Sequence, residues 1–250
     1  MEHTVVQLVF AIGFGIAAGG VVKGVAGIGL PLVAVPIMTL AVDVPTAVSL
    51  MIFPILTSNV WQAVRGGRWR KAVRRFWPLL VAQPVATVAG VAVLANANQR
   101  LLIGILGVIV VLFVAAMQFM PAWEVPPSRE RLLSPLAGLV SGFLGGLASF
   151  LGLPIAMYLL ALRLDKDDFI ATVGVTFTSG GLVLMLSLMA FGLFGAQLWL
   201  WSALAVPAVF IGMKLGEILR HRMDAQAFRK VVLAVLFLVG LNLVRKGLMG

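Results

Sequence analysis

Two groups of polar residues lie inside otherwise apolar stretches, and all of their side chains can donate or accept hydrogen bonds. They are Thr57, Ser58 and Asn59 in the first half of the chain and Thr176, Thr178 and Ser179 in the second. Hydroxyl and amide groups among apolar helices either join helices to one another or line a cavity. Neutral donors suit an oxyanion that must be bound and then released. We therefore predict that both groups contact an anion, and Gln83 is a further candidate, with Ser49 and Thr172 weaker ones.

A glycine-rich stretch with one lysine offers the charge that an anion site needs. Lys23 is the only cation before Arg65, and the stretch Gly24–Pro31 follows it directly. Unwound backbone here would leave amides free, and glycine lets a ligand approach closely. A helix restarting at Pro31 would present its positive N-terminal end. The predicted binding residues are Lys23, Gly24, Gly27 and Gly29. The alternative is that the glycines pack helices closely and that Lys23 extends to the membrane interface.

A second stretch, Gly145–Pro154, resembles the first. The tripeptide Gly29-Leu30-Pro31 recurs as Gly152-Leu153-Pro154. Ser149 and Gly152 of this second stretch complete the set of predicted binding residues.

The composition indicates that membrane helices position these residues. Of the 250 residues 61% are hydrophobic and 11% are charged, and the mean hydropathy is +1.09, whereas a soluble chain carries about 25% charged residues. The absence of cysteine excludes disulfides, thiol catalysis and cysteine-bound zinc. The net charge of +10 lies in a few short loops, which is typical of membrane topology rather than of nucleic-acid binding.

The sequence predicts an all-α polytopic membrane protein with about ten transmembrane or partly re-entrant helices. The apolar runs are Thr4–Val22, Ala26–Val42, Pro45–Val64, Phe76–Ala95, Leu101–Met120, Leu132–Phe150, Leu151–Leu162, Phe169–Phe191, Gln197–Leu219 and Phe228–Val244. A spanning helix needs about 20 residues. The second and seventh runs are shorter, so either can be a broken or re-entrant piece instead of a full crossing.

The basic loop Arg65–Arg75 predicts the orientation, because positively charged loops stay in the cytoplasm. Counting outward from it through ten helices places the N-terminus outside. Only Arg100, Arg245 and Lys246 of the 19 basic residues then fall on the outer side. We expect Asp165, Asp167 and Asp168 to pair with the neighbouring Arg163 and Lys166.

The two halves resemble each other weakly, which predicts an internal repeat. Beside the glycine motifs, Gly19 matches Gly142, Pro84 matches Pro207, and Thr57-Ser58 matches Thr178-Ser179. We predict repeats at residues 1–121 and 132–250, joined by a cytoplasmic linker at 122–131. The basic loop corresponds to the uncharged Gly192–Ala196, as an inverted duplication demands. Inverted repeats are typical of secondary transporters with a midplane site where the halves meet.

The stretch Gly24–Pro31, its counterpart Gly145–Pro154 and the duplicated architecture resemble the sulfite exporter TauE/SafE family. The resemblance covers nearly the whole chain. It implies a multi-pass permease of the bacterial inner membrane for sulfite, sulfoacetate and related sulfur-containing or organic anions. Family members often carry a run of three glycines before the proline, whereas this chain has Gly-Ile-Gly-Leu-Pro and Phe-Leu-Gly-Leu-Pro. This departure leaves the substrate open.

The leading hypothesis is thus a permease, and an exporter, for a small sulfur-containing or organic oxyanion. Its partners are the anion and the bilayer; we expect no cofactor, no metal and no nucleic acid, and the oligomeric state stays open. The same fold working as an importer coupled to Na⁺ or H⁺ is the first alternative. An intramembrane enzyme using Ser49 with Lys23 and a structural subunit of a larger assembly are the others.

Overall fold

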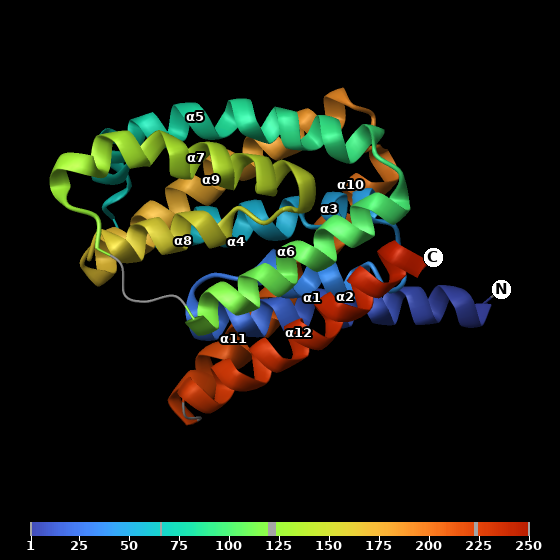
Figure 1. Ribbon diagram of the computed structural model, residues 1–250. Coiled ribbons are helices and arrows are strands. Elements are labelled where there is room, and N and C mark those ends of the chain that lie inside the picture. Colours follow the sequence, from blue (N-terminus) through green and yellow to red (C-terminus); the bar gives the residue numbers. More distant parts are fainter. Residues whose placement is uncertain (1, 66, 120–123, 223–224, 250) are drawn as a thin grey trace.

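The computed structural model describes residues 2–65, 67–119, 124–222 and 225–249, and helices make up most of these ranges (Figure 1). Gly66, the predicted end of the fifth run at Met120, and linker residues 122–123 lie outside the described residues. The helices are α1 (Glu2–Ala26), α2 (Leu30–Met38), α3 (Val44–Leu50), α4 (Ile52–Arg65), α5 (Trp69–Asn96), α6 (Gln99–Phe119), α7 (Pro127–Ala148), α8 (Gly152–Ala161), α9 (Lys166–Ala190), α10 (Ala196–Leu204), α11 (Val206–Arg222) and α12 (Ala225–Met249).

Single helices and pairs of consecutive helices form segments that are long enough to cross a membrane. Within the described ranges, seven segments have the length and the composition of a membrane span, and Ile12–Ala26 adds a shorter apolar one. Two of the seven consist of consecutive helices, because only Met51 separates α3 from α4 and only Ala205 separates α10 from α11. The predicted all-helical polytopic membrane fold is confirmed.

The two short runs are short helices that turn back inside the bundle. α2 has nine residues and α8 has ten, which is about 14–15 Å of helix against a hydrocarbon core of about 30 Å. Each forms a hairpin with the helix before it. The tip of the α1–α2 hairpin is Gly27–Gly29, and the tip of the α7–α8 hairpin is Ser149–Leu151.

The first hairpin turns later than the sequence predicted. α1 continues to Ala26, past the predicted end at Val22, and α2 begins at Leu30 instead of Ala26. Gly27 and Gly29 have φ angles of 78° and 100°, which glycine adopts readily and which end one helix before the next begins.

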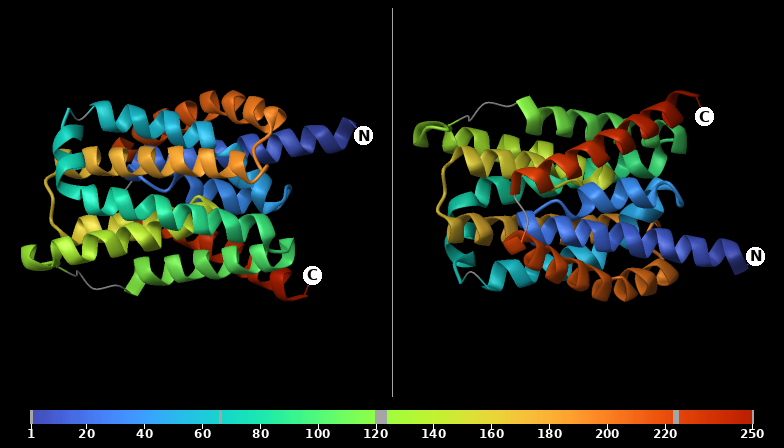
Figure 2. Two further views of the ribbon diagram at one scale, coloured as in Figure 1. Left: turned by 90° about the horizontal axis from the view of Figure 1, so that it is seen from above. Right: turned by 90° about the horizontal axis from the view of Figure 1, so that it is seen from below.

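The loops gather at the two ends of the bundle (Figure 2). Arg68, between α4 and α5, contacts Asp165, between α8 and α9; we name this the basic end. At the opposite end, the Val44 amide donates to the Gln99 side chain at 3.3 Å and the Ser49 hydroxyl donates to the Leu193 carbonyl at 2.9 Å. α2 leads back to the opposite end and α8 to the basic end, so the two hairpin tips point in opposite directions.

Glycines let helices from the two halves of the chain pack closely. On α1, a Cβ at Gly20 or Gly24 would overlap the α11 backbone at Val209 or Met213. On α7, a Cβ at Gly142 or Gly146 would overlap backbone carbonyl oxygens of α5. Spacings of four residues between small side chains are typical of close helix packing in membranes. The pair α1–α11 in one part of the bundle thus corresponds to the pair α7–α5 in another.

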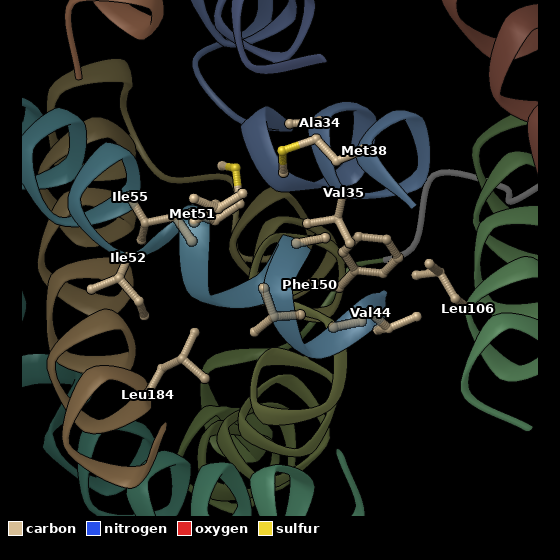
Figure 3. Close-up of a cluster of buried hydrophobic side chains, with 14 of the residues drawn as sticks. Ala34, Val35, Met38, Val44, Met51, Ile52, Ile55, Leu106, Phe150 and Leu184 are labelled. Carbon is tan, nitrogen blue, oxygen red and sulfur yellow. The ribbon is translucent and has the colours of Figure 1, made fainter. Parts of the chain in front are cut away.

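A buried apolar core fills the bundle between the hairpin tips and the opposite end (Figure 3). Phe150, at the tip of the second hairpin, belongs to the same cluster as Val35 of α2, Val44 of α3 and Leu106 of α6. All four residues are at most 3% exposed. Packed side chains therefore fill the bundle between the hairpin tips and the opposite end.

Candidate functional site

A cavity of about 390 Å³ lies where the two hairpin tips meet. Both tips contribute to its wall, with Gly29 from the first and Ser149 from the second, and Gly152 at the start of α8 also lines it. Other lining residues come from α4, α6, α9 and α12. Met117, Leu160 and Val232 line it from the last turn of α6, the last turn of α8 and the second turn of α12, all near the basic end. The cavity therefore extends from the hairpin tips toward the basic end.

Lys23 is the charged residue of this wall. Its side chain is only 3% exposed, and its ammonium donates a hydrogen bond to the Asn59 side-chain oxygen. The Asn59 amide nitrogen is engaged elsewhere, since it donates to the Ile55 carbonyl at 2.8 Å. Among the described residues no carboxylate forms an ion pair with Lys23. An ammonium has three donors, so two remain for a ligand.

Ser149 provides a second free donor. It is fully buried, lines the cavity, and its hydroxyl has no hydrogen-bond partner among the described residues. Its φ of 61° is left-handed, a conformation that costs a residue with a Cβ about 1–2 kcal/mol. A buried polar group without a partner and a strained backbone at the same residue are features that concentrate at ligand sites.

The beginnings of two helices face this cavity. Gly29 precedes the first turn of α2 and Gly152 opens α8, and both line the wall. The first amides of a helix have no partner inside the helix, and they carry about half a positive charge. Together with the Lys23 ammonium, two such ends make this part of the cavity positive and able to bind an anion.

The rest of the wall is apolar. Its large side chains include Phe113, Met117, Met157, Leu160, Leu233 and Leu236. Binding sites for organic ligands have this character, with a few polar groups among apolar ones. The sequence alone does not identify these residues as part of a site, because nothing distinguishes them from the other apolar residues of the chain.

Of the predicted binding residues, the structure brings Lys23, Gly29, Asn59, Ser149 and Gly152 to the cavity wall. The predicted hydroxyl residues other than Ser149 do not line it. The hydroxyl groups of four of them donate to carbonyls three or four residues earlier in their own helices: Thr57 and Ser58 on α4, and Thr176 and Thr178 on α9. Ser179 follows Thr178 on α9. Ser49 and Thr172 likewise bond to backbone carbonyls.

The remaining predicted residues have packing or turn positions. Gly24 faces Met213 of α11, and Gly27 forms the turn, where its carbonyl accepts a hydrogen bond of 3.2 Å from the Gln62 side chain. Gln83 is fully buried beside Gly180, and neither of its amide atoms has a partner among the described residues.

At the basic end, ion pairs connect segments that are distant in the sequence. Asp165 and Asp168 pair with Arg68, and Asp168 also with Lys71, whereas Arg163 pairs with Glu124. The expected pairing of the aspartates with Arg163 is thus wrong, and the Lys166 side chain lies outside the described residues. The hydrogen bond from Arg68 to Asp168, with the nearby charge of Asp165, raises the pKa of the Arg68 guanidinium, so this cation keeps its charge.

The comparisons with known proteins agree with these features. The family model "Sulfite exporter TauE/SafE" matches residues 11–243. Neither curated proteins nor solved structures gave a match. The described residues hold no group of three His, Asp or Glu side chains placed to bind a metal ion. The matching family consists of membrane transporters for sulfite-type anions, not of enzymes. Because the match spans nearly the whole sequence, the chain belongs to the sulfite exporter TauE/SafE family.

Proposed function

We propose that the protein is a permease of the bacterial inner membrane that exports a small sulfur-containing or organic oxyanion. The observation that carries this proposal is the buried Lys23 ammonium, which has a neutral amide partner and no carboxylate among the described residues. A buried charge is costly unless it is paired. An anion in the cavity would pair with Lys23, accept a hydrogen bond from Ser149 and face the first amides of α2 and α8.

The wall favours an anion with a carbon part over a bare inorganic one. One water molecule occupies about 30 Å³ of liquid, so sulfite, with four heavy atoms, fills a small part of a cavity of about 390 Å³. An oxyanion group at Lys23 would leave a carbon chain among Phe113, Met117 and Leu236.

The proposed mechanism is alternating access around this cavity, with the two halves as inverted repeats. The support is the correspondence of helix pairs, since α1 packs on α11 as α7 packs on α5. The hairpins α1–α2 and α7–α8 also have equivalent places in the two halves. With the basic end in the cytoplasm, the cavity would face inward, and the core around Phe150 would close the outer side.

Export needs no coupling ion in this scheme. Each negative charge that leaves an inside-negative cell gains about 2.3 kcal/mol per 100 mV. Import of the same anion would need a cation partner, which makes a Na⁺- or H⁺-coupled importer the alternative.

Flux measurements in proteoliposomes test the proposal. Labelled sulfite and short alkanesulfonates are loaded on one side, and a potential is imposed in either direction. We expect flux driven by the potential alone, faster for a sulfonate than for sulfite. Flux that requires a Na⁺ or proton gradient would favour the importer, and no flux of any of these anions would contradict the proposal.

A further inference from the structure

The first two turns of α5 form a separate short segment at the basic end. α5 has 28 residues, about 42 Å of helix, which exceeds what a hydrocarbon core of about 30 Å requires. Phe76 has non-helical angles (φ −103°, ψ 21°) and Pro78 follows, so the helix bends here. In the left view of Figure 2 the start of α5 lies across the end of the bundle, whereas the part after the bend runs along it. Trp69–Arg75 is therefore an interfacial segment.

One face of this segment is tied to the protein. Ala72 and Phe76 are buried. On the same side, Lys71 pairs with Asp168 of α9, and Arg75 pairs with Glu130 of α7 at 2.7 Å. These contacts fix how the segment is rotated about its axis.

The other face combines aromatic side chains with cations that have no acidic partner. Trp69 and Val73 are 44% and 38% exposed and lie one turn apart, and Trp77, just after the bend, is 61% exposed. Arg70 and Arg74, one turn apart, are exposed. Among the described residues neither arginine pairs with a carboxylate; the Arg70 guanidinium lies 5.2 Å from the centre of the Trp69 ring. Carboxylates thus neutralise Lys71 and Arg75 on the inner face, whereas Arg70 and Arg74 on the outer face keep a charge that is unpaired within the described residues.

We propose that this outer face binds the headgroups of anionic phospholipids. A segment that lies flat at the membrane surface places tryptophan at the level where its ring is favoured and arginine at the level of the phosphates. Arg70 and Arg74 are spaced to reach the phosphates of one or two neighbouring lipids. The inner face holds the segment on α7 and α9. A lipid bound to the outer face therefore also anchors the end of α4, the helix that carries Asn59 and precedes α5.

Fluorescence quenching of the full-length protein in vesicles tests the proposal. Phosphatidylcholine vesicles carry a minor fraction of either brominated phosphatidylglycerol or brominated phosphatidylcholine, and bromine quenches tryptophan on contact. We expect stronger quenching by the anionic lipid. The double variant Arg70→Gln/Arg74→Gln should lose this excess, since each cation near the surface contributes about fivefold to the binding of anionic lipid.

Two further variants make the result specific. Arg245→Gln/Lys246→Gln removes the same charge from the last helix, and it should keep the excess quenching. Trp69→Phe/Trp77→Phe should abolish it, which assigns the signal to this face. Helical circular dichroism checks that each variant is folded. Equal quenching by both lipids in the unmodified protein, or an excess that survives Arg70→Gln/Arg74→Gln, would overturn the proposal.

Discussion

The Lys23 ammonium and the Asn59 side-chain oxygen are hydrogen-bonded across the wall of the cavity. They come from different helices, α1 and α4, and both are almost completely buried. The bond holds the ammonium one turn before the tip of the first hairpin, in the wall of the cavity that the start of α2 also lines. Among the described residues Lys23 is the only charged one in this wall, and it is placed by a neutral partner, which does not compete with an anion for it.

Lys23→Gln should reduce anion binding and transport tenfold to about a hundredfold, because a hydrogen bond to a charged group contributes about 1.5–3 kcal/mol. The folded protein should persist, since glutamine can still donate to Asn59. Binding is measured as thermal stabilisation by sulfite and by a short sulfonate. Lys214→Gln, at an exposed lysine of α11, is the matched control and should bind normally. Unchanged binding by the Lys23 variant would remove this residue from the site.

Asn59→Leu should impair transport much more than Thr57→Val. Asn59 holds the ammonium, whereas the Thr57 hydroxyl donates to the Phe53 carbonyl of its own helix at 2.6 Å. Initial rates of flux in proteoliposomes compare the two variants at equal amounts of folded protein. Equal losses would mean that Thr57 contributes to the site after all, as the sequence predicts.

Ser149→Gly and Ser149→Ala separate the hydroxyl from the backbone strain. Both remove the free donor, so both should weaken anion binding by a few-fold to about tenfold. Only glycine relieves the left-handed conformation, and its variant should therefore be more stable than the alanine variant by about 1 kcal/mol. Thermal unfolding in detergent gives the stability and ligand shifts give the binding. If the two variants bind like the unmodified protein, the Ser149 hydroxyl does not touch the anion.

Gly24→Ala should destabilise the protein by about 1–3 kcal/mol, the usual cost of overpacking, because the added methyl group would overlap the Met213 backbone. Gly13→Ala on the same helix meets nothing within 4 Å and serves as the control. Thermal unfolding of both variants makes the comparison. A stable Gly24→Ala protein that no longer binds anions would return Gly24 to the binding site.

Single-cysteine labelling tests the orientation. The chain has no cysteine, so each variant carries one thiol. Gly195→Cys, at the opposite end, should react with an impermeant maleimide in intact cells. Arg129→Cys, next to Glu130 at the basic end, should react only after permeabilisation. Labelling of both positions from the same side would refute the proposed inverted duplication.

The sequence predicted the helical membrane fold and the most polar part of the cavity, because both depend on rare residue types. A lone lysine and an asparagine among apolar residues stand out. Thr57 and Asn59 looked equivalent, but a helical threonine satisfies its hydroxyl on its own backbone, and a difference of two residues turns it to another face. Ser149 is recognisable as a binding residue only from its unpartnered hydroxyl and its φ angle.

The ion pairs at the basic end show the same limit. Proximity in sequence favoured Arg163 for the aspartates, whereas the fold brings Arg68 to them from a loop nearly a hundred residues away in the chain. The apolar wall could not be predicted either, since the residues that line the cavity and those that face lipid are of the same types.

The interlocked glycine contacts have a mechanical consequence. α1 packs on α11 and α7 packs on α5. Neither half of the polypeptide, expressed alone, would therefore form a complete core. In the proposed alternating-access cycle, each moving body would contain helices from both halves of the chain. We therefore expect that a chain cut at its midpoint yields two fragments that are stable only when both are present together.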